Sequence, residues 1–419
     1  MTQSNTTPPI EATGPLKGIR ILDLSRVLAA PWCMQNLGDL GADIVKIERP
    51  GMGDESRHWG PPFFKDGDGK DTKESAYYMS FNRNKRSVAV DMTKPEGQAL
   101  IRKLAENADI CIENFKVGDL ARYGLDYASL AKINPKLIYC SVTGFGQDGP
   151  YAERPGYDYL FQGMGGLMSV TGERDEMPGG GPQRVGQPIV DLFTGMYATI
   201  SILAALHHRD VTGEGQHIDV SLLGAVMAMS SGSLSNYMMT GNIPKRTGNV
   251  SPMIMPYGVF TCSDGPIIVA SANQGQFVAF CKALGHPEWA SDERFINNAG
   301  RVANQVALNE LFASVMKTRT RAEWDEILLA AGVPAGPINN YAQALEHPQV
   351  KHLNTRIGIP HPIGVDAPGT ANPMRFSKTK VNYRRPPPLL GQHTMEVLRE
   401  AGLDEAAIQA LVASGAIPG

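Results

Sequence analysis

The sequence lacks the glycine-rich motifs with which most nucleotide-binding domains hold phosphate groups. Its first apolar segment, residues 18–24, is followed by Ser25-Arg26-Val27-Leu28-Ala29-Ala30-Pro31 in place of GxGxxG, and GxxxxGK[ST] does not occur. HExxH and GxSxG are absent too, which argues against zinc-peptidase and serine-hydrolase chemistry. The chain therefore carries no sequence motif for a bound NAD, ATP or catalytic metal.

Cysteine and net charge are also scarce. Five cysteines stand far apart without CxxC spacing, which predicts reduced thiols, no metal site and a cytoplasmic location. A formal net charge of −3 provides no basic surface for nucleic acid or an anionic membrane, so neither is expected as a partner.

No hydrophobic run has the length and composition of a membrane span. The longest, Leu192–Leu206, is shorter than the ~20 apolar residues that a span needs and contains threonine, serine and glycine, so it predicts a buried helix. Residues 1–15 are polar and rich in proline and threonine, without the charged and apolar regions of a secretory signal. We interpret them as a disordered tail.

The sequence does contain a regular alternation of strand and helix patterns. Short runs rich in Ile, Val and Leu predict strands, with helical patterns between most of them, at residues 18–24, 42–48, 87–92, 109–114 and 136–142. This order predicts an α/β fold with a Rossmann-like large domain built on a parallel sheet. A hairpin pattern around Ser263-Asp264-Gly265, followed by helices, predicts a smaller α+β domain. The expected parts are a large domain at 16–225, a linker helix at 226–246, the small domain at 247–340 and a return to the large domain at 341–419.

One carboxylate stands out in the apolar stretch Val185–Leu206, where Asp191 is the only charged residue. An aspartate directly before an apolar run is a favoured helix N-cap, contributing about 1 kcal/mol, and Pro188 fits the same boundary. A helix N-terminus also stabilises the anion, so this carboxylate could act as a nucleophile towards an acyl group. The residue pattern alone leaves both interpretations open.

Motifs spread along the chain resemble those of family III CoA-transferases. They are Gly18–Leu24, Val27–Pro31, Leu40–Glu48, Asn82–Ser87, Glu113–Phe115, Ser141–Gly146, Pro155–Asp158 and Asp191–Met196. The resemblance extends from about residue 16 to the closing segment Arg385–His393. Within the family, Trp59–Phe63, Gly336–Asn340 and Arg385–His393 are most similar to the succinyl-CoA:glutarate branch.

The resemblance implies a Rossmann-like domain without nucleotide chemistry, in a homodimer of two interlocked chains. It places Asp191 at the position of the family's nucleophile, which forms an aspartyl mixed anhydride and an aspartyl–CoA thioester. The substrates would be an acyl-CoA and a free carboxylic acid, with no tightly bound cofactor and no metal. The positions that match the family's CoA-contacting residues are Arg49, Val90, Asn114, Phe115 and Arg122. An arginine at such a position suits a CoA phosphate, because its guanidinium donates two parallel hydrogen bonds. Members of the family use a mobile loop to exclude water, and its counterpart in this sequence is Ala272–Gln276. The candidate site residues within this loop are Gln274, Gly275 and Gln276.

Departures from the family pattern narrow the implied activity. The segment 272–276 has a single glycine, and Leu28 stands where formyl-CoA transferase has glutamine, which argues against formyl or oxalate transfer. Tyr157 stands where the related racemases have histidine, and tyrosine is a poor proton acceptor at neutral pH. We therefore expect transfer of CoA from a dicarboxylyl-CoA such as succinyl-CoA.

Three basic side chains near the first strand are candidates to bind the acceptor's distal carboxylate: Arg26, Arg57 and His58. Two alternative functions stay open. An acyl-CoA racemase or isomerase would exchange an α-proton without forming a new acyl-CoA, and a non-catalytic CoA-binding subunit would show no turnover.

Overall fold

The computed structural model describes residues 11–419, which divide into two compact units. The first comprises residues 11–167, Val185–Ser235 and Lys351–Gly419, and the second comprises Met168–Arg184 and Asn236–Val350. The second unit contains the whole of the expected small domain. It also includes Met168–Arg184, a segment that the sequence analysis assigned to the large domain.

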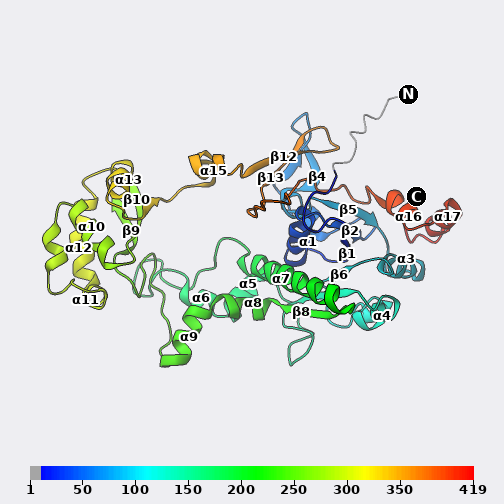
Figure 1. Ribbon diagram of the computed structural model, residues 1–419, viewed down its shortest axis with the longest axis horizontal. Coiled ribbons are helices and arrows are strands. Elements are labelled where there is room, and N and C mark those ends of the chain that lie inside the picture. The colour runs from blue at the N-terminus through cyan, green and yellow to red at the C-terminus, as the bar shows by residue number, and fades with distance from the viewer. Residues whose placement is uncertain (1–10) are drawn as a thin grey trace. The chain divides into compact units, whose positions relative to one another are not determined.

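A six-stranded sheet forms the base of the first unit (Figure 1). Its strands are β1 (Arg20–Asp23), β2 (Asp43–Glu48), β5 (Lys85–Ala89), β6 (Ile110–Glu113), β7 (Ile138–Thr143) and β8 (His217–Ser221). They lie in the order β5-β2-β1-β6-β7-β8, and every pairing is parallel. Counted along this sheet alone, the order is the 3-2-1-4-5-6 arrangement of dinucleotide-binding folds. The predicted α/β architecture with a parallel sheet is confirmed.

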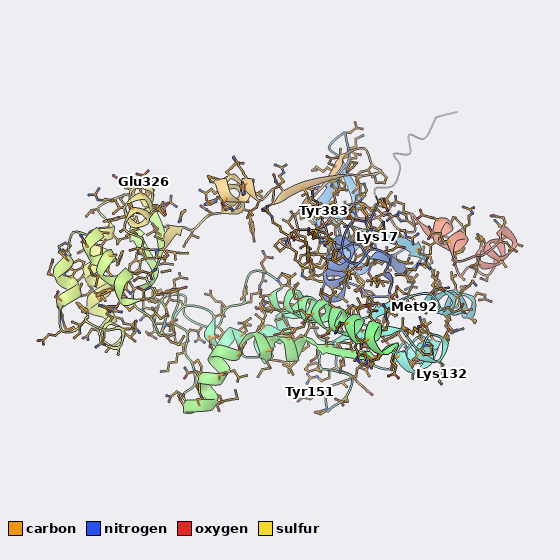
Figure 2. All side chains as sticks on the ribbon, in the orientation of Figure 1. Lys17, Met92, Lys132, Tyr151, Glu326 and Tyr383 are labelled. Atoms are coloured by element: carbon orange, nitrogen blue, oxygen red, sulfur yellow. The ribbon has the colours of Figure 1, made fainter. Side chains whose placement is uncertain are left out.

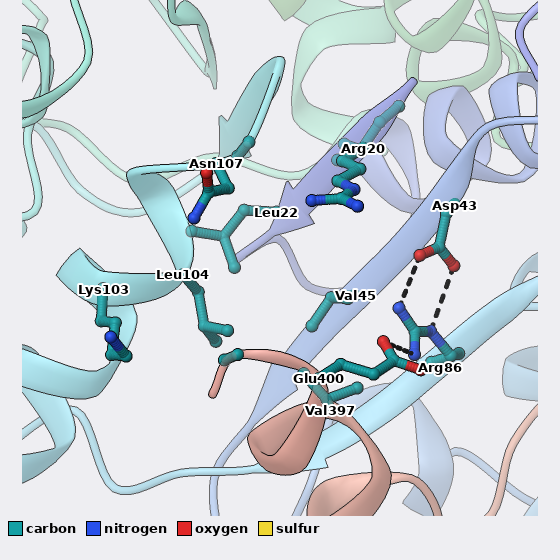
Figure 3. Close-up of a pocket in the computed structure, with 13 residues that line it drawn as sticks. Arg20, Leu22, Asp43, Val45, Arg86, Lys103, Leu104, Asn107, Val397 and Glu400 are labelled. Atoms are coloured by element: carbon teal, nitrogen blue, oxygen red, sulfur yellow. Dashed lines mark hydrogen bonds and ion pairs between the residues drawn. The ribbon is translucent and has the colours of Figure 1, made fainter. Parts of the chain in front are cut away.

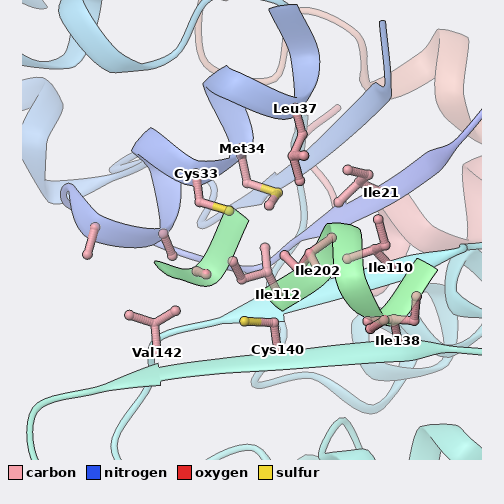
Figure 4. Packing of buried hydrophobic residues seen from close by; sticks show 14 of the residues in the cluster. Ile21, Cys33, Met34, Leu37, Ile110, Ile112, Ile138, Cys140, Val142 and Ile202 are labelled. Atoms are coloured by element: carbon pink, nitrogen blue, oxygen red, sulfur yellow. The ribbon is translucent and has the colours of Figure 1, made fainter. Parts of the chain in front are cut away.

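Alternate residues of the central strands face opposite layers of helices. Ile21 packs with α1 (Ala29–Asp39) and α7 (Ile189–Thr212) in one apolar core, part of which Figure 4 shows. Leu22 belongs to a second core, together with side chains of α3 (Pro95–Ala105), α4 (Tyr127–Ile133), α16 (Thr394–Glu400) and α17 (Glu405–Ala413). Each fully buried Leu or Ile contributes roughly 2 kcal/mol, so both layers hold the sheet in place.

Helix α7 is the one helix among residues 11–419 with the length and hydropathy of a membrane span. Its residues Val190, Ala198 and Ile202 are fully buried in the core of the first unit. Gly195 is buried where α7 crosses α1, because a Cβ there would lie 2.5 Å from the carbonyl oxygen of Ala29. The helix ends at Gly213, whose φ of +81° is the left-handed conformation that favours glycine at a helix end.

Residues 11–15 are packed onto the first unit, which corrects part of the predicted disordered tail; residues 1–10 of that tail lie outside the described residues. Gly14 is buried, and a Cβ there would lie 1.9 Å from the carbonyl oxygen of Leu40. Thr13 donates a hydrogen bond to the carbonyl oxygen of Lys380, and Asn382 donates one to that of Glu11. These contacts join residues 11–13 to residues 380–382, which are far apart in the sequence, so the local composition could not predict them.

The first unit also contains elements that the strand and helix patterns did not predict. Two antiparallel hairpins are among them: β3 (Phe63–Lys65) with β4 (Asp71–Ser75), and β12 (Arg356–Pro360) with β13 (Asp366–Thr370). The unit also includes η1 (Glu55–His58), α2 (Ala76–Phe81), η2 (Ala121–Tyr123), α5 (Asp158–Met164) and α8 (Leu222–Met229).

The second unit combines a three-stranded antiparallel sheet with helices. The sheet has the order β11 (Ala335–Pro337), β10 (Gly265–Ala270), β9 (Tyr257–Cys262), and the predicted hairpin at 263–265 joins β9 to β10. Its helices are α10 (Gln274–Ala283), η3 (Pro287–Ser291), α11 (Asn298–Ala303), α12 (Gln305–Met316), α13 (Arg321–Ala330) and α14 (Tyr341–Glu346). The chain passes between the units within three helices, α6 (Leu167–Val170), α9 (Ser231–Thr240) and α15 (Pro348–His352), and once more between Arg184 and Val185. The expected linker helix at 226–246 is divided between α8 and α9.

Candidate active site

The switch point of the parallel sheet lies between β1 and β6, because the strand order runs outwards in both directions from this pair. Ligands of such folds bind outside the carboxyl ends of the strands at this point. The two chain segments that leave these ends are tied together. The Arg26 N–H donates to Asn114 Oδ1 over 2.9 Å, and Asn114 Nδ2 donates to the Arg26 carbonyl oxygen over 2.7 Å. Two neighbouring clefts open beside this link.

The first, named the basic cleft after its arginines Arg26, Arg49 and Arg122, has a volume of about 300 Å³ and lies beyond the ends of β1, β2 and β5. Acidic side chains line it as well. Four of the five residues predicted to contact CoA line it, namely Arg49, Val90, Phe115 and Arg122. The Arg49 side chain has no hydrogen-bond or ion-pair partner among residues 11–419, so its guanidinium is free for a phosphate. Arg122 pairs with Asp119 at 2.6 Å. Met92, labelled in Figure 2, adds an apolar surface to the same cleft.

The second, the aspartate cleft, contains Asp191 together with Leu28, Asn114 and Tyr157. It shares Arg26, Glu55 and Phe115 with the basic cleft, so the two clefts adjoin each other. The Arg26 guanidinium lies 4.8 Å from the centre of the Phe115 ring and pairs with Glu55 at 2.5 Å. The fold thus brings the predicted nucleophile and the predicted CoA residues to one edge of the sheet.

Asp191 is the third residue of α7, which corrects the predicted N-cap position. The N-cap is Pro188, whose side chain cannot accept a hydrogen bond. A carboxylate from helix α5 caps α7 instead, because Asp158 Oδ2 accepts hydrogen bonds from the N–H groups of Val190 (2.7 Å) and Asp191 (3.1 Å). Asp158 Oδ1 also accepts from Gln162 Nε2 at 2.5 Å, which fixes its orientation.

The Asp191 carboxylate accepts no hydrogen bond from any side chain or backbone group in residues 11–419. Burial and then the nearby charge of Asp158 raise the pKa of Asp191 to about 7. The carboxylate is thus poorly solvated and unpaired, which makes the ionised form reactive, and near neutral pH it is roughly half ionised.

Tyr77 is a further residue that the sequence analysis did not select. Burial, followed by the charges of Asp191 and Asp158, raises the pKa of its hydroxyl. Its ring packs against Trp59 and Phe81, with both centroid distances at 5.3 Å. Asp158 belongs to the motif Pro155–Asp158, but nothing in that motif indicated a role for its carboxylate. Tyr77 lies in no recognised motif, so no pattern in the sequence provided a reason to select it.

The segment that leads into both clefts is fixed by buried charges. Lys46 Nζ lies 3.0 Å from Asp54 Oδ2, and both side chains are fully buried. Asp54 accepts in turn from the N–H of Val27, which has a φ of +70°, a strained value for a β-branched residue. Burial opposes ionisation of Asp54, but Lys46 and Ser56 outweigh it and lower the pKa of this carboxyl to about 2.

Arg57 belongs to this buried network, which corrects its prediction as a ligand of the acceptor. Its guanidinium binds Glu48 at 2.7 and 2.9 Å, Glu74 at 2.6 Å and the Tyr78 hydroxyl at 2.5 Å, and the residue is 2% exposed. The guanidinium is thus buried between two carboxylates and does not line either cleft. His58 is exposed and its Nε2 lies 2.9 Å from the Met52 carbonyl oxygen.

The predicted water-excluding loop belongs to the second unit, where most of it is helical. Gln274, Gly275 and Gln276 form the first turn of α10, whose N-cap Asn273 accepts from the Gln276 N–H at 2.9 Å. Gln274 Oε1 accepts from the buried Arg301 at 2.7 Å. The segment thus begins a helix, and its mobility stays a prediction.

A separate hollow of about 320 Å³ opens at the opposite, amino-terminal edge of the sheet (Figure 3). Arg86 lies there and pairs with Asp43 and Glu400. It contains none of the predicted site residues, and ligands of this fold class bind at the other edge.

Comparison with known proteins decides the family. The family model described as CoA-transferase family III matches residues 16–394. The chain belongs to CoA-transferase family III. It is 46% identical to the succinate–glutarate CoA-transferase of Agrobacterium fabrum over 92% of this chain and 95% of the relative. It is 41% identical to the human succinyl-CoA:glutarate CoA-transferase over 96% of this chain and 90% of the relative.

A solved structure of the same family supports the fold. The crystal structure of a CAIB/BAIF family protein from Brucella suis matches with a TM-score of 0.82 and 45% sequence identity, over 93% of this chain and 100% of that one. The family resemblance inferred from the sequence motifs is thus confirmed, and this family III CoA-transferase acts by moving CoA between acids.

Proposed function

We propose that this family III transferase moves CoA from a dicarboxylyl-CoA such as succinyl-CoA to a free carboxylic acid, with Asp191 as the nucleophile. The observation that carries the proposal is the unpaired, poorly solvated Asp191 carboxylate in a cleft that adjoins the basic cleft. The activities named for the relatives, which act on succinate and glutarate or their CoA thioesters, support the choice of dicarboxylic acids.

The reaction needs four acyl exchanges. An Asp191 carboxylate oxygen attacks the thioester carbonyl carbon, the C–S bond breaks, and a mixed anhydride and CoA thiolate form. The thiolate attacks the Asp191 carbonyl carbon, which releases the donor acid and leaves an aspartyl–CoA thioester. The acceptor carboxylate then attacks that thioester to give a second anhydride and free thiolate. Finally, the thiolate attacks the acceptor acyl carbon, which yields the new acyl-CoA and restores the Asp191 carboxylate.

The two clefts suggest how the substrates are divided. Arg49 and Arg122 would bind CoA phosphates in the basic cleft, and the thioester would reach Asp191 past the shared residues Arg26 and Phe115. Asn114, which braces the Arg26 carbonyl, keeps this passage in shape. A desolvated site also protects the anhydride from hydrolysis.

The test is mass spectrometry of purified enzyme incubated with succinyl-CoA and a panel of carboxylic acids. We expect a new acyl-CoA that is absent with Asp191→Ala. An acceptor labelled with ¹⁸O in its carboxylate should pass label to Asp191, which peptide mass analysis would detect. Full turnover by Asp191→Ala would refute the nucleophile. Deuterium exchange at an α-carbon without any new acyl-CoA would favour the racemase alternative.

We further propose that the chain works as an interlocked homodimer. One face of α7 exposes large apolar side chains at helical spacing, namely Phe193, Met196, Tyr197, Ile200 and Leu203. A second copy of the chain would cover this face. Light scattering should give twice the 45.2 kDa chain mass, and a monomer at that mass for Ile200→Glu would support the role of the face. A monomeric wild type would refute the proposal.

A further inference from the structure

The closing motif Arg385–His393 contributes to neither cleft, although it is one of the segments that resemble the family. It passes along β5 in the first unit and, with the end of the β12–β13 hairpin, encloses a cavity of about 230 Å³. The walls are Pro360–Pro362 and Pro386, and the polar groups are Arg385, Gln392 and His393. This C-terminal cavity shares no lining residue with the aspartate cleft or the basic cleft.

The backbone around the C-terminal cavity is fixed by its own hydrogen bonds. Asn84 holds Arg385 from both sides, because the Asn84 N–H donates to the Arg385 carbonyl oxygen at 2.9 Å and Asn84 Oδ1 accepts from the Arg385 N–H at 3.1 Å. The His393 N–H donates to the Ser87 carbonyl oxygen at 2.9 Å, and Ser87 Oγ accepts from the Gly391 N–H at 2.9 Å. The cavity is therefore formed before any ligand binds, which lowers the entropic cost of binding.

The guanidinium of Arg385 has no ion-pair or hydrogen-bond partner among residues 11–419. Its neighbour Arg384 differs, since that guanidinium donates to the carbonyl oxygens of Gly38, Gly41 and Ala42. Acids near the motif are already engaged, because Arg86 binds Asp43, Glu396 and Glu400 at 2.5, 3.0 and 2.6 Å. No acidic residue lines the cavity, so no carboxylate within it pairs with Arg385.

Two further donors accompany Arg385. Nδ1 of His393 accepts from the Ser87 N–H at 3.2 Å, so the ring proton sits on Nε2, which is left as a donor. Burial lowers the pKa of His393 to about 4, which keeps this neutral tautomer at physiological pH. Oε1 of Gln392 accepts from the Leu389 N–H at 2.9 Å, which leaves the Nε2 amide hydrogens free. His361 is no donor, because its Nε2 is committed to the Pro387 carbonyl oxygen at 3.0 Å.

We propose that the C-terminal cavity is a second binding site for a small oxyanion, held by Arg385 with Gln392 and His393. The shared chemistry is that of a carboxylate or a phosphate: a planar guanidinium offers two parallel N–H groups to either, and the amide and imidazole N–H groups complete the set. The volume admits a short organic acid or inorganic phosphate. None of the three groups lines the aspartate cleft or the basic cleft.

Isothermal titration calorimetry without any acyl-CoA tests the site and requires no turnover. Succinate, glutarate and inorganic phosphate are titrated into wild type, Arg385→Gln and the control Arg399→Gln. Arg385→Gln keeps the backbone bonds to Asn84 and removes the guanidinium. Arg399→Gln makes the same change at an exposed position of α16, where the partner Glu405 lies 3.6 Å away. We expect Arg385→Gln to weaken one binding event at least tenfold and Arg399→Gln to leave it unchanged.

The titrations separate the possible ligands and the neighbouring sites. Binding of succinate and glutarate alone would assign the cavity to organic acids, and binding of phosphate alone would assign it to phosphate. A phosphate event that survives Arg49→Gln and disappears in Arg385→Gln belongs to the C-terminal cavity and not to the basic cleft. As a second readout, the ligand should raise the melting temperature of wild type and Arg399→Gln but not of Arg385→Gln. Identical isotherms for Arg385→Gln and wild type, or an equal loss in both variants, would overturn the proposal.

Discussion

Replacing Asp191 by asparagine should abolish transfer and at the same time stabilise the fold. Burial and the charge of Asp158 raise the pKa of the native carboxyl to about 7, from an ordinary value of 3.8. A carboxyl whose pKa is raised by folding binds its proton more tightly in the native state. Its ionisation therefore costs no stability below pH 3.8, and the cost is complete only above pH 7. Asparagine has the same shape and carries no charge to desolvate.

The size of the effect follows from the difference between the two pKa values. One pKa unit corresponds to about 1.36 kcal/mol, so the cost of ionising Asp191 grows from roughly 2 kcal/mol at pH 5 to roughly 4 kcal/mol at pH 8. Thermal and urea unfolding of wild type and Asp191→Asn at both pH values measures this difference. Asp210→Asn on the same helix is the matched control, because Asp210 is exposed beside Arg209, and it should change stability by less than about 0.5 kcal/mol. If Asp191→Asn is no more stable than wild type at pH 8, the carboxylate is not desolvated and the reasoning fails.

Three further predictions follow from the site. The specificity constant for transfer, kcat/KM, should fall roughly tenfold from pH 8 to pH 6 as Asp191 is protonated. Asp158→Asn should shift this loss of activity to lower pH. An unchanged pH profile would show that the charge of Asp158 does not act on Asp191. Arg57→Met should lower the free energy of unfolding by about 3–5 kcal/mol, because Glu48 and Glu74 lose their buried partner, and a loss below about 1 kcal/mol in urea unfolding would contradict the network. Arg49→Gln should raise KM for succinyl-CoA about tenfold with little change in kcat, and steady-state kinetics showing the reverse pattern would remove Arg49 from the CoA site.

The strand and helix patterns were sufficient to predict the parallel sheet, because buried parallel strands are short apolar runs that stand out from the helices between them. The hairpin at Ser263-Asp264-Gly265 was predicted for a similar local reason. The hairpins β3–β4 and β12–β13 were missed, since their strands are short, polar or interrupted by proline and glycine. Such strands owe their existence to neighbours distant in the chain.

The sequence by itself determined the family, the sheet and the identity of the lone carboxylate in an apolar helix, because each depends on residue order and composition. Tertiary structure alone decided how that carboxylate is held. Asp158 caps a helix that begins over thirty residues later along the chain, and Arg57 is consumed by Glu48 and Glu74 instead of facing a substrate. The ion-pair partner of a charged side chain and its exposure to water both depend on which segments pack together in the fold. A local sequence pattern contains no information about either.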